Sequence, residues 1–187
     1  MGASRLILAS RSLQRRDILR QIGVEFEIRV PDVEELDAGP PEEVVLENAF
    51  RKAASVAAGV GPGDPPVLGV DTVVALGATI YGQPRDEAHA GEMLSALGGR
   101  THRVVSGVCL IGDRPVTAAA VTAVQFRALP AALLSWYLAT GEWRGRAGGY
   151  AIQGRGAVLV SRIEGDYLNV VGLPVTTLLE LAPGLVG

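Results

Sequence analysis

Asp71 is the residue whose type and position point most directly to chemistry. It interrupts an apolar run, standing after Val70 and just before Val73 and Val74. Burying an unpaired carboxylate in a strand costs roughly several kcal/mol, so we expect Asp71 at a strand end or edge that faces a cleft. There it could hold a divalent metal or accept a proton from water, as carboxylates do in metal-assisted hydrolysis. The structural alternative is an Asp that only accepts hydrogen bonds from turn amides.

The segment 10–16, with the sequence SRSLQRR, is a second candidate site. It follows a short apolar run and opens a helical pattern in which Ser12 can serve as the N-cap. Hydroxyls, helix N-terminal amides and guanidinium groups can therefore converge there on phosphate oxygens. A capped helix with solvated arginines is an equally good interpretation of the segment alone. The segment is not a Walker A loop, since no glycine-rich turn ends in Lys followed by Ser or Thr.

Four more polar side chains are candidates of a weaker kind. Lys52 follows Asn48 by four positions in a helical pattern, so both project from one side of that helix, although a solvated lysine is the ordinary case. Glu34 and Glu35 lie in an acidic loop and could add a second carboxylate to a metal site, whereas most acidic loops are only soluble surface. Gln153 stands in a glycine-flanked segment, where its amide could read a base edge or simply be solvated.

The elements that must position these residues indicate a mixed α/β fold. Apolar runs predict strands, helical spacing and caps predict helices, and Gly and Pro separate them. The break at 59–66 is too short for a free linker, so we expect one domain over residues 1–187, built as two lobes around a central cleft. Strands are predicted over 5–9, 25–30, 67–76, 79–81, 104–111, 116–126 and 157–163, and helices over 12–22, 42–58, 86–97, 130–140 and 175–181.

Composition excludes several classes of protein. Of 187 residues, 48% are hydrophobic, which suffices for a core, and 17 Lys and Arg against 20 Asp and Glu give a net charge of −3. No overall basic field is available to bind nucleic acid. Cys109 is the single cysteine, and neither a secretory signal nor an apolar stretch of about 20 residues is evident, so a cytoplasmic protein without a membrane span is expected. The isolated His89 and His102 do not suggest a zinc site.

Taken together and in order, these features resemble the Maf family, the septum-formation-inhibitor-like nucleotide pyrophosphatases. The resemblance extends over nearly the whole chain. It rests on residues 8–10 (LAS) followed by Ser12 and Arg15-Arg16, on 31–35 (PDVEE), Lys52-Ala53, 69–74 (GVDTVV), 98–102 (GGRTH), 147–154 (AGGYAIQG) and 164–174 (EGDYLNVVGLP). A structural α/β domain without a ligand would require this ordered set to be a coincidence.

The resemblance implies a mixed central sheet flanked by helices, like that of the Maf and inosine triphosphatase proteins. It also implies hydrolysis of a nucleoside triphosphate to the monophosphate and pyrophosphate with Mg²⁺ or Mn²⁺. Asp71, Glu35 and Lys52 would then be catalytic, and Glu35 and Asp71 would also bind the metal. Arg15 and Ser10, together with the Lys52 ammonium, would bind the substrate phosphates.

The same resemblance assigns base specificity to Gln14, Thr72 and Gln153. Thr72 and Gln153 match the branch that acts on dTTP and UTP, but that branch usually has Arg where Gln14 stands. We therefore expect a pyrimidine or a modified nucleotide as substrate. The family also commonly has Pro where Leu13 stands and Lys where Gln83 stands, so one expected cation is missing from the cleft.

The missing cation is the best support for an alternative, a nucleotide-binding regulatory module of cell division with little turnover. The enzyme interpretation instead implies nucleotide-pool housekeeping, with a link to cell-division arrest. In either case the expected partners are a small-molecule nucleotide and, as one option, a second copy of the chain in a homodimer. Nucleic acid and membranes are not expected partners.

Overall fold

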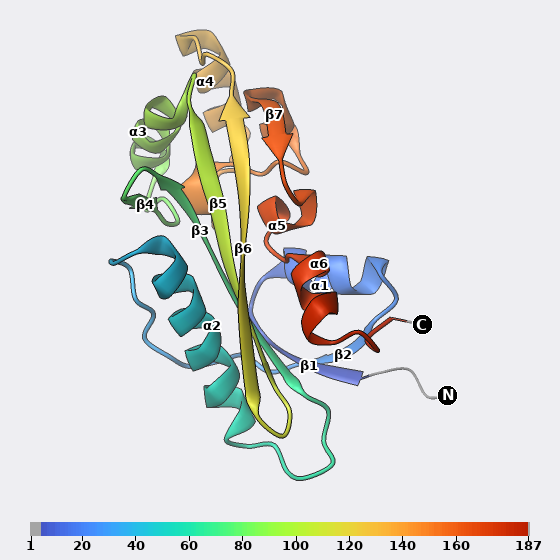
Figure 1. Cartoon of the computed structure of the whole chain (residues 1–187). Coiled ribbons are helices and arrows are strands. Elements are labelled where there is room, and N and C mark those ends of the chain that lie inside the picture. The colour runs from blue at the N-terminus through green and yellow to red at the C-terminus, as the bar shows by residue number, and fades with distance from the viewer. Residues whose placement is uncertain (1–4, 187) are drawn as a thin grey trace.

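A mixed seven-stranded sheet runs through the centre of the molecule (Figure 1). The computed structural model describes residues 5–186, so residues 1–4 and 187 of the predicted domain lie outside this description. The strand order is β2-β1-β3-β5-β6-β7, and β4 pairs with one end of β3. β1 runs parallel to β2 and β3, whereas the other neighbours are antiparallel. The strands are β1 (Arg5–Ala9), β2 (Glu25–Ile28), β3 (Val67–Leu76), β4 (Thr79–Tyr81), β5 (Thr101–Ile111), β6 (Pro115–Phe126) and β7 (Val160–Glu164).

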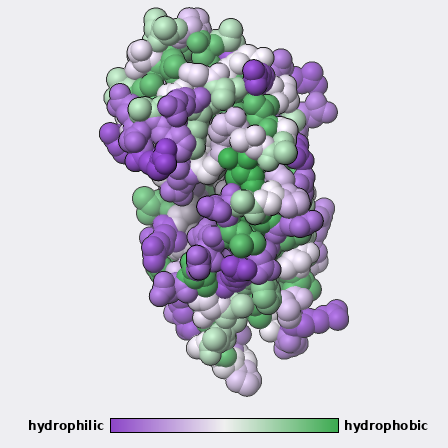
Figure 2. Space-filling model, turned by 90° about the vertical axis from the view of Figure 1, so that its left-hand side faces the viewer, coloured by the Kyte–Doolittle hydropathy of each residue, from purple (hydrophilic) through white to green (hydrophobic). Residues whose placement is uncertain are grey.

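Helices flank this sheet on both faces, which confirms the expected α/β class (Figure 1). α2 (Pro41–Ala57) covers one face, and α1 (Leu13–Gln21) and α6 (Val175–Leu181) pack on the other. α3 (Glu87–Leu97) and α4 (Ala131–Ala139) lie at the far end of the long strands. Figure 2 shows the side that bears α2 and α3, where hydrophilic residues predominate and hydrophobic ones form small patches. In residues 5–186 we find no helix that combines the length and the apolar character needed to span a membrane.

The two largest of the four hydrophobic core clusters in residues 5–186 lie in two different lobes of the molecule. One core joins α1 and α6 to the sheet through buried residues such as Leu19 and Leu178. The other lies at the opposite end and includes Leu94 of α3, Tyr137 of α4 and Phe126 of β6. The strands β3 and β5 contribute to both cores, so they connect the lobes.

α2 approaches the sheet closely because two strand positions beneath it are glycine. A Cβ atom at Gly69 would clash with the carbonyl oxygen of Ala49, and one at Gly107 would clash with the carbonyl oxygen of Val45. Any larger residue at either position would push α2 away from the sheet. The short helix–sheet distance allows Lys52, on the same helix, to reach β3.

The chain after residue 150 differs most from expectation. The strand predicted over 157–163 begins only at Val160, because residues 155–159 form a 3₁₀ helix, η2 (Arg155–Leu159), with Gly156 tight against the backbone of Ala151. A second 3₁₀ helix, η1 (Ala147–Gly149), lies earlier. The segment 165–174, for which no helix or strand was predicted, contains α5 (Tyr167–Val171), whose first turn is capped by the side chain of Asp166. Short glycine-flanked helices such as these give almost no periodic signal.

Candidate active site

A cavity of about 680 Å³ opens where one edge of β3 is left uncovered. β1 pairs with β3 only as far as Ala9 opposite Gly69, and β4 pairs with it only from Val74 onward. In the described chain, residues 70–73 therefore have no strand partner on this side, although β5 pairs with them on the other. Asp71 lies in this gap, at a strand edge as its sequence context predicted. The volume is typical of a small-molecule site.

The structure brings all the predicted site residues to this one cavity, where they come from both lobes. Alternation along β3 directs Asp71 and Thr72 to opposite faces of the sheet, so the cavity reaches around the free edge of the strand. The predicted residues that line it are Ser10, Gln14, Arg15, Glu35, Lys52, Asp71, Thr72 and Gln153.

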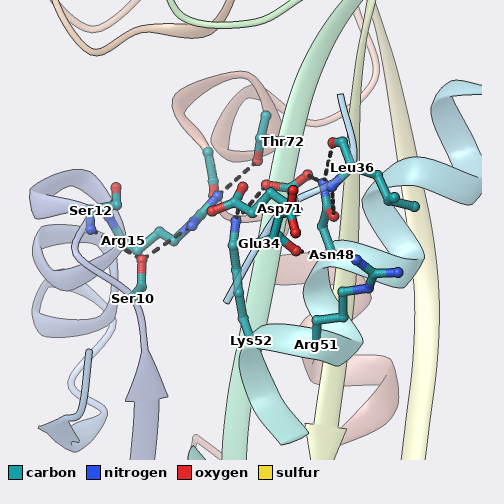
Figure 3. Close-up of polar contacts among 12 residues, drawn as sticks. Ser10, Ser12, Arg15, Glu34, Leu36, Asn48, Arg51, Lys52, Asp71 and Thr72 are labelled. Carbon is teal, nitrogen blue, oxygen red and sulfur yellow. Dashed lines mark hydrogen bonds and ion pairs between the residues drawn. The ribbon is translucent and has the colours of Figure 1, made fainter. Parts of the chain in front are cut away.

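Asp71 is held by two side chains of α2 (Figure 3). The Lys52 ammonium lies 2.7 Å from Asp71 Oδ1 and 2.7 Å from Glu35 Oε2. Asn48 donates a hydrogen bond from Nδ2 to Asp71 Oδ2 at 3.0 Å, and its amide also exchanges hydrogen bonds with the backbone of Leu36. Asn48 thus ties the loop that carries Glu35 to the carboxylate. The sequence predicts that Asn48 shares a helix side with Lys52, but nothing in the sequence assigns Asn48 to the site.

The surroundings of Asp71 favour its ionised form. Burial alone would raise the pKa of this carboxyl group, but the charge and hydrogen bond of Lys52, the hydrogen bond of Asn48 and the charge of Arg15 outweigh that effect and lower the pKa. Asp71 is consequently a carboxylate at neutral pH. A buried carboxylate beside a cavity can accept a proton from, or orient, a water molecule.

Arg15 is fixed by three hydrogen bonds across the cleft. Its guanidinium donates to the carbonyl oxygen of Gly172 at 2.9 Å, to Ser10 Oγ at 3.2 Å and to Thr72 Oγ1 at 3.2 Å. Burial lowers the pKa of Arg15, and the negative charges of Asp71 and Glu35 oppose this effect. Thr72 Oγ1 also contacts Ser106 Oγ at 2.9 Å. The hydroxyl of Thr72 is therefore engaged on both sides, by Ser106 and by the Arg15 guanidinium that it helps to hold.

The N-terminus of α1 opens onto the same cavity. Ser12 is its N-cap, as predicted, and accepts a hydrogen bond from the backbone N–H of Arg15. Ser12 also donates to Gln14 Oε1 at 3.1 Å. Leu13 is the first residue of the helix and is 62% exposed, which is the position where Pro is most easily accommodated in other chains. The replacement of Pro by Leu there is therefore compatible with the same helix start.

The opposite wall of the cavity carries Gln153 on a loop between η1 and η2. Tyr137, which is fully buried, accepts a hydrogen bond from the backbone N–H of Ala151 at 3.0 Å. Glu142 accepts one from the backbone N–H of Arg155 at 2.7 Å. These two contacts hold the loop on either side of Gln153, so its position depends on α4 and on the turn that follows α4.

His102 is buried behind the cavity wall and is not part of the site chemistry. Its Nε2 lies 2.9 Å from the hydroxyl of Tyr150, which lines the cavity, and its ring packs edge-on against Phe126. Burial lowers the pKa of His102 to about 4, so the ring is neutral at physiological pH. Cys109 is buried as well, and burial raises the pKa of its thiol to about 11.

The donor set fits a divalent cation that is shared with a substrate. Among residues 5–186 no group of three or more His, Cys, Asp and Glu side chains could enclose a metal. Mg²⁺ seldom uses such an all-protein cage and is usually bound through one or two carboxylates plus substrate phosphates. Asp71 and Glu35, joined through Lys52, are two carboxylates of this kind on the wall of one cavity.

A model of the family described as Maf-like protein matches residues 5–184. The chain belongs to the Maf family. This confirms the resemblance inferred from the motifs, most of which contribute residues to the one cavity, although the segment 98–102 does not line it.

Curated relatives of this Maf protein carry the name dTTP/UTP pyrophosphatase. One from Symbiobacterium thermophilum is 46% identical over 90% of this chain and 88% of its own length. Another, from Pyrococcus furiosus, is 43% identical over 95% of this chain and 93% of its own length. Among solved structures, a HAM1 protein from Coxiella burnetii is similar over 65% of this chain and 72% of that chain, with 18% identity and a TM-score of 0.48.

Proposed function

We propose that this Maf protein is a nucleoside triphosphate pyrophosphatase that cleaves dTTP or UTP into the nucleoside monophosphate and pyrophosphate. The observation that carries the proposal is the buried carboxylate of Asp71, kept ionised by Lys52 and Asn48 at the wall of a cavity of about 680 Å³. Hydroxyl and guanidinium groups of Ser10 and Arg15 line the same cavity. The names of relatives at 46% and 43% identity support the enzyme class and the choice of pyrimidine.

In the proposed reaction, water attacks the α-phosphorus and the bond from that phosphorus to the bridging oxygen breaks. Asp71 orients the water and accepts its proton, while pyrophosphate leaves with the bridging oxygen. Arg15 and Lys52 stabilise the negative charge that develops on the phosphate oxygens, because both are positioned before the substrate binds. Ser10, whose hydroxyl is already within reach of Arg15, donates to the same phosphates.

The proposed cofactor is Mg²⁺ or Mn²⁺, held by Asp71 and Glu35. When bound, such an ion supplies Lewis-acid stabilisation of phosphate charge. Lys52 keeps the two carboxylates together at 2.7 Å from its ammonium, so it organises the site for a cation that arrives with the nucleotide. Loss of activity in EDTA, restored by Mg²⁺ or Mn²⁺, is the expected result.

Base selection is proposed for Gln14 and Gln153, which line the cavity from opposite lobes. The amide of each can donate and accept, which suits the paired donor and acceptor atoms of a pyrimidine edge. Thr72 contributes by holding Arg15. Tyr137 and Glu142 hold the backbone on either side of Gln153, so the lobe that contains α3 and α4 presents the amide of Gln153 to the base.

The test is product analysis on a panel of nucleoside triphosphates with Mg²⁺ or Mn²⁺. The expected result is equal amounts of pyrophosphate and monophosphate, with the highest kcat/KM for dTTP or UTP. Release of orthophosphate would contradict the proposed bond cleavage, and turnover limited to purine triphosphates would contradict the proposed base. Tight nucleotide binding without turnover would favour the regulatory module.

A further inference from the structure

The side chain of Arg146 is a cation of the cavity wall that has no ion-pair partner among residues 5–186. It lines the cavity in the loop before η1 and is partly buried. Its Nε atom is buried without a hydrogen-bond partner, and no carboxylate of residues 5–186 forms an ion pair with it. A buried, unpaired guanidinium N–H is costly, and Arg146 lacks the partners that hold the other buried cations of the cavity, Lys52 and Arg15.

The other four cations that line the cavity either have partners within the protein or are exposed to water. Lys52 contacts Glu35 and Asp71, and Arg15 makes its three hydrogen bonds. Arg144 stacks on the ring of Trp143, with 4.5 Å between the guanidinium carbon and the ring centroid. Arg11 is exposed, so water can solvate it. Arg146 alone among these five combines a place on the cavity wall with a buried, unsatisfied donor.

The backbone around Arg146 is fixed, which keeps its side chain at the cavity. Arg146 N–H donates to the carbonyl oxygen of Trp143 at 3.2 Å, and Gly149 N–H donates to that of Arg146 at 3.0 Å. Gly148 N–H donates to the carbonyl oxygen of Gly82 at 3.0 Å. This last bond joins the Arg146 loop to the turn that carries the exposed, neutral Gln83, which lines the same cavity.

We propose that Arg146 binds the phosphate chain of the nucleotide from the side opposite Arg15. The inference deepens the proposed function and rests on it. Three carboxylates, those of Asp32, Glu35 and Asp71, line the cavity beside only two buried cations. A triphosphate adds several negative charges, so it requires a further cation, and the planar fork of an arginine matches phosphate oxygens. In this chain Arg146 supplies the charge that Gln83 does not.

The test is binding of inorganic tripolyphosphate, measured by titration calorimetry on the full chain with Mg²⁺. Arg146→Gln should weaken this binding by about 10- to 100-fold, as expected for loss of a charge-assisted contact. Arg162→Gln is the matched control, because Arg162 is exposed on β7 and does not line the cavity. It removes the same charge and should leave the affinity within about threefold, since exposed charges outside the site are screened. Adding Gln83→Lys to Arg146→Gln should restore much of the affinity.

Stability gives an independent readout. Because Arg146 has no counter-ion in the free protein, Arg146→Gln should not lower the Tm, and a lowered Tm with unchanged tripolyphosphate affinity would show a structural role instead. Unchanged affinity in a folded Arg146→Gln variant overturns the inference. The inference is also overturned if Arg146→Gln weakens the binding of nucleotides but not of tripolyphosphate and alters the base preference, because Arg146 would then contact the base.

Failure of the inference and of the proposed function are distinguishable. If the wild type releases no pyrophosphate but binds tripolyphosphate through Arg146, the function fails and the phosphate contact stands. If the wild type cleaves dTTP or UTP and Arg146→Gln retains both kcat/KM and tripolyphosphate affinity, the function stands and the contact fails.

Discussion

The ammonium of Lys52 lies 2.7 Å from Asp71 Oδ1, and each side chain is only 9% exposed. The two residues come from different elements, α2 and β3, and meet because Gly69 and Gly107 let α2 approach the sheet. The contact offsets the desolvation of Asp71 and leaves it ionised. It therefore links the packing of the fold directly to the protonation state of Asp71 on which the proposed hydrolysis depends.

Replacing Lys52 by Met should affect both stability and pH dependence. Removing one partner of a buried ion pair leaves an uncompensated charge and typically costs about 3–5 kcal/mol in the free energy of unfolding. Burial would then raise the pKa of Asp71, so the acid limb of the pH–rate profile should move to higher pH. Denaturant unfolding and kcat/KM against pH measure the two effects, and an unmoved acid limb would contradict the role given to Lys52.

The ion pair also determines how the free energy of unfolding of the wild type changes in acid: it should fall as the pH falls. The pKa of Asp71 is lower in the folded protein than in the unfolded chain, where it is near 3.8. The stabilisation is therefore complete above the unfolded value and is lost as the pH falls through the folded value. Asp71→Asn should accordingly flatten the dependence of unfolding free energy on pH below about pH 4, and an unchanged slope would show that Asp71 is not stabilised by its partners.

Thr72→Val should weaken substrate binding through Arg15. The substitution keeps the shape but removes the oxygen that accepts from Arg15 Nη2 at 3.2 Å, so the guanidinium loses one of three fixed contacts. We expect kcat/KM to fall by about tenfold, the value of one hydrogen bond to a charged group, mainly through KM. Thr72→Ser retains the hydroxyl and should remain close to the wild type. Equal losses in both variants would indicate a role for the methyl group.

Tyr137→Phe should change base selectivity more than overall turnover. The phenol oxygen accepts the backbone N–H of Ala151, and its loss leaves that buried donor unsatisfied at a cost of about 1–3 kcal/mol. The loop carrying Gln153 should then be less well positioned. The ratio of kcat/KM for UTP to that for a purine triphosphate is the relevant measurement. A Tm decrease with an unchanged ratio would mean that Tyr137 only stabilises the fold.

The buried neutral ring of His102 should make the free energy of unfolding decrease in mild acid. The pKa of His102 is lowered by burial from 6.5 to about 4, so the unfolded chain binds a proton that the folded protein excludes. The free energy of unfolding should therefore fall by about 3 kcal/mol between pH 6.5 and pH 4. His102→Gln, whose amide can still contact Tyr150, should lack this part of the slope. Parallel curves for the two proteins would contradict the buried neutral imidazole.

The fold and the candidate site differ in how far the sequence predicts them. Long periodic segments such as α2 and β3 could be predicted, because burial on one face or along a whole strand leaves a pattern. The short helix α5 and the 3₁₀ helix η2 could not, since five residues beside glycines carry no period. Asp71 was identifiable because a carboxylate in an apolar strand needs a physical explanation.

Contacts between distant segments required the structure. Asn48 shares a helix side with Lys52, yet its hydrogen bonds to Asp71 and Leu36 depend on how closely α2 packs on β3. The free edge of β3 results from where β1 ends and β4 begins. Arg146 had no distinguishing signal in the sequence, because only the fold shows that its Nε is buried without a partner.

Pyrophosphate release from UTP and dTTP by the wild type and by Asp71→Asn tests the central claim most directly. The substitution keeps the size of the side chain and removes the base, so circular dichroism should show a folded variant. We expect the rate to fall by about 10²- to 10⁴-fold, the usual contribution of a general base. A folded Asp71→Asn variant that releases pyrophosphate at the wild-type rate would contradict the assignment of Asp71 as the catalytic carboxylate.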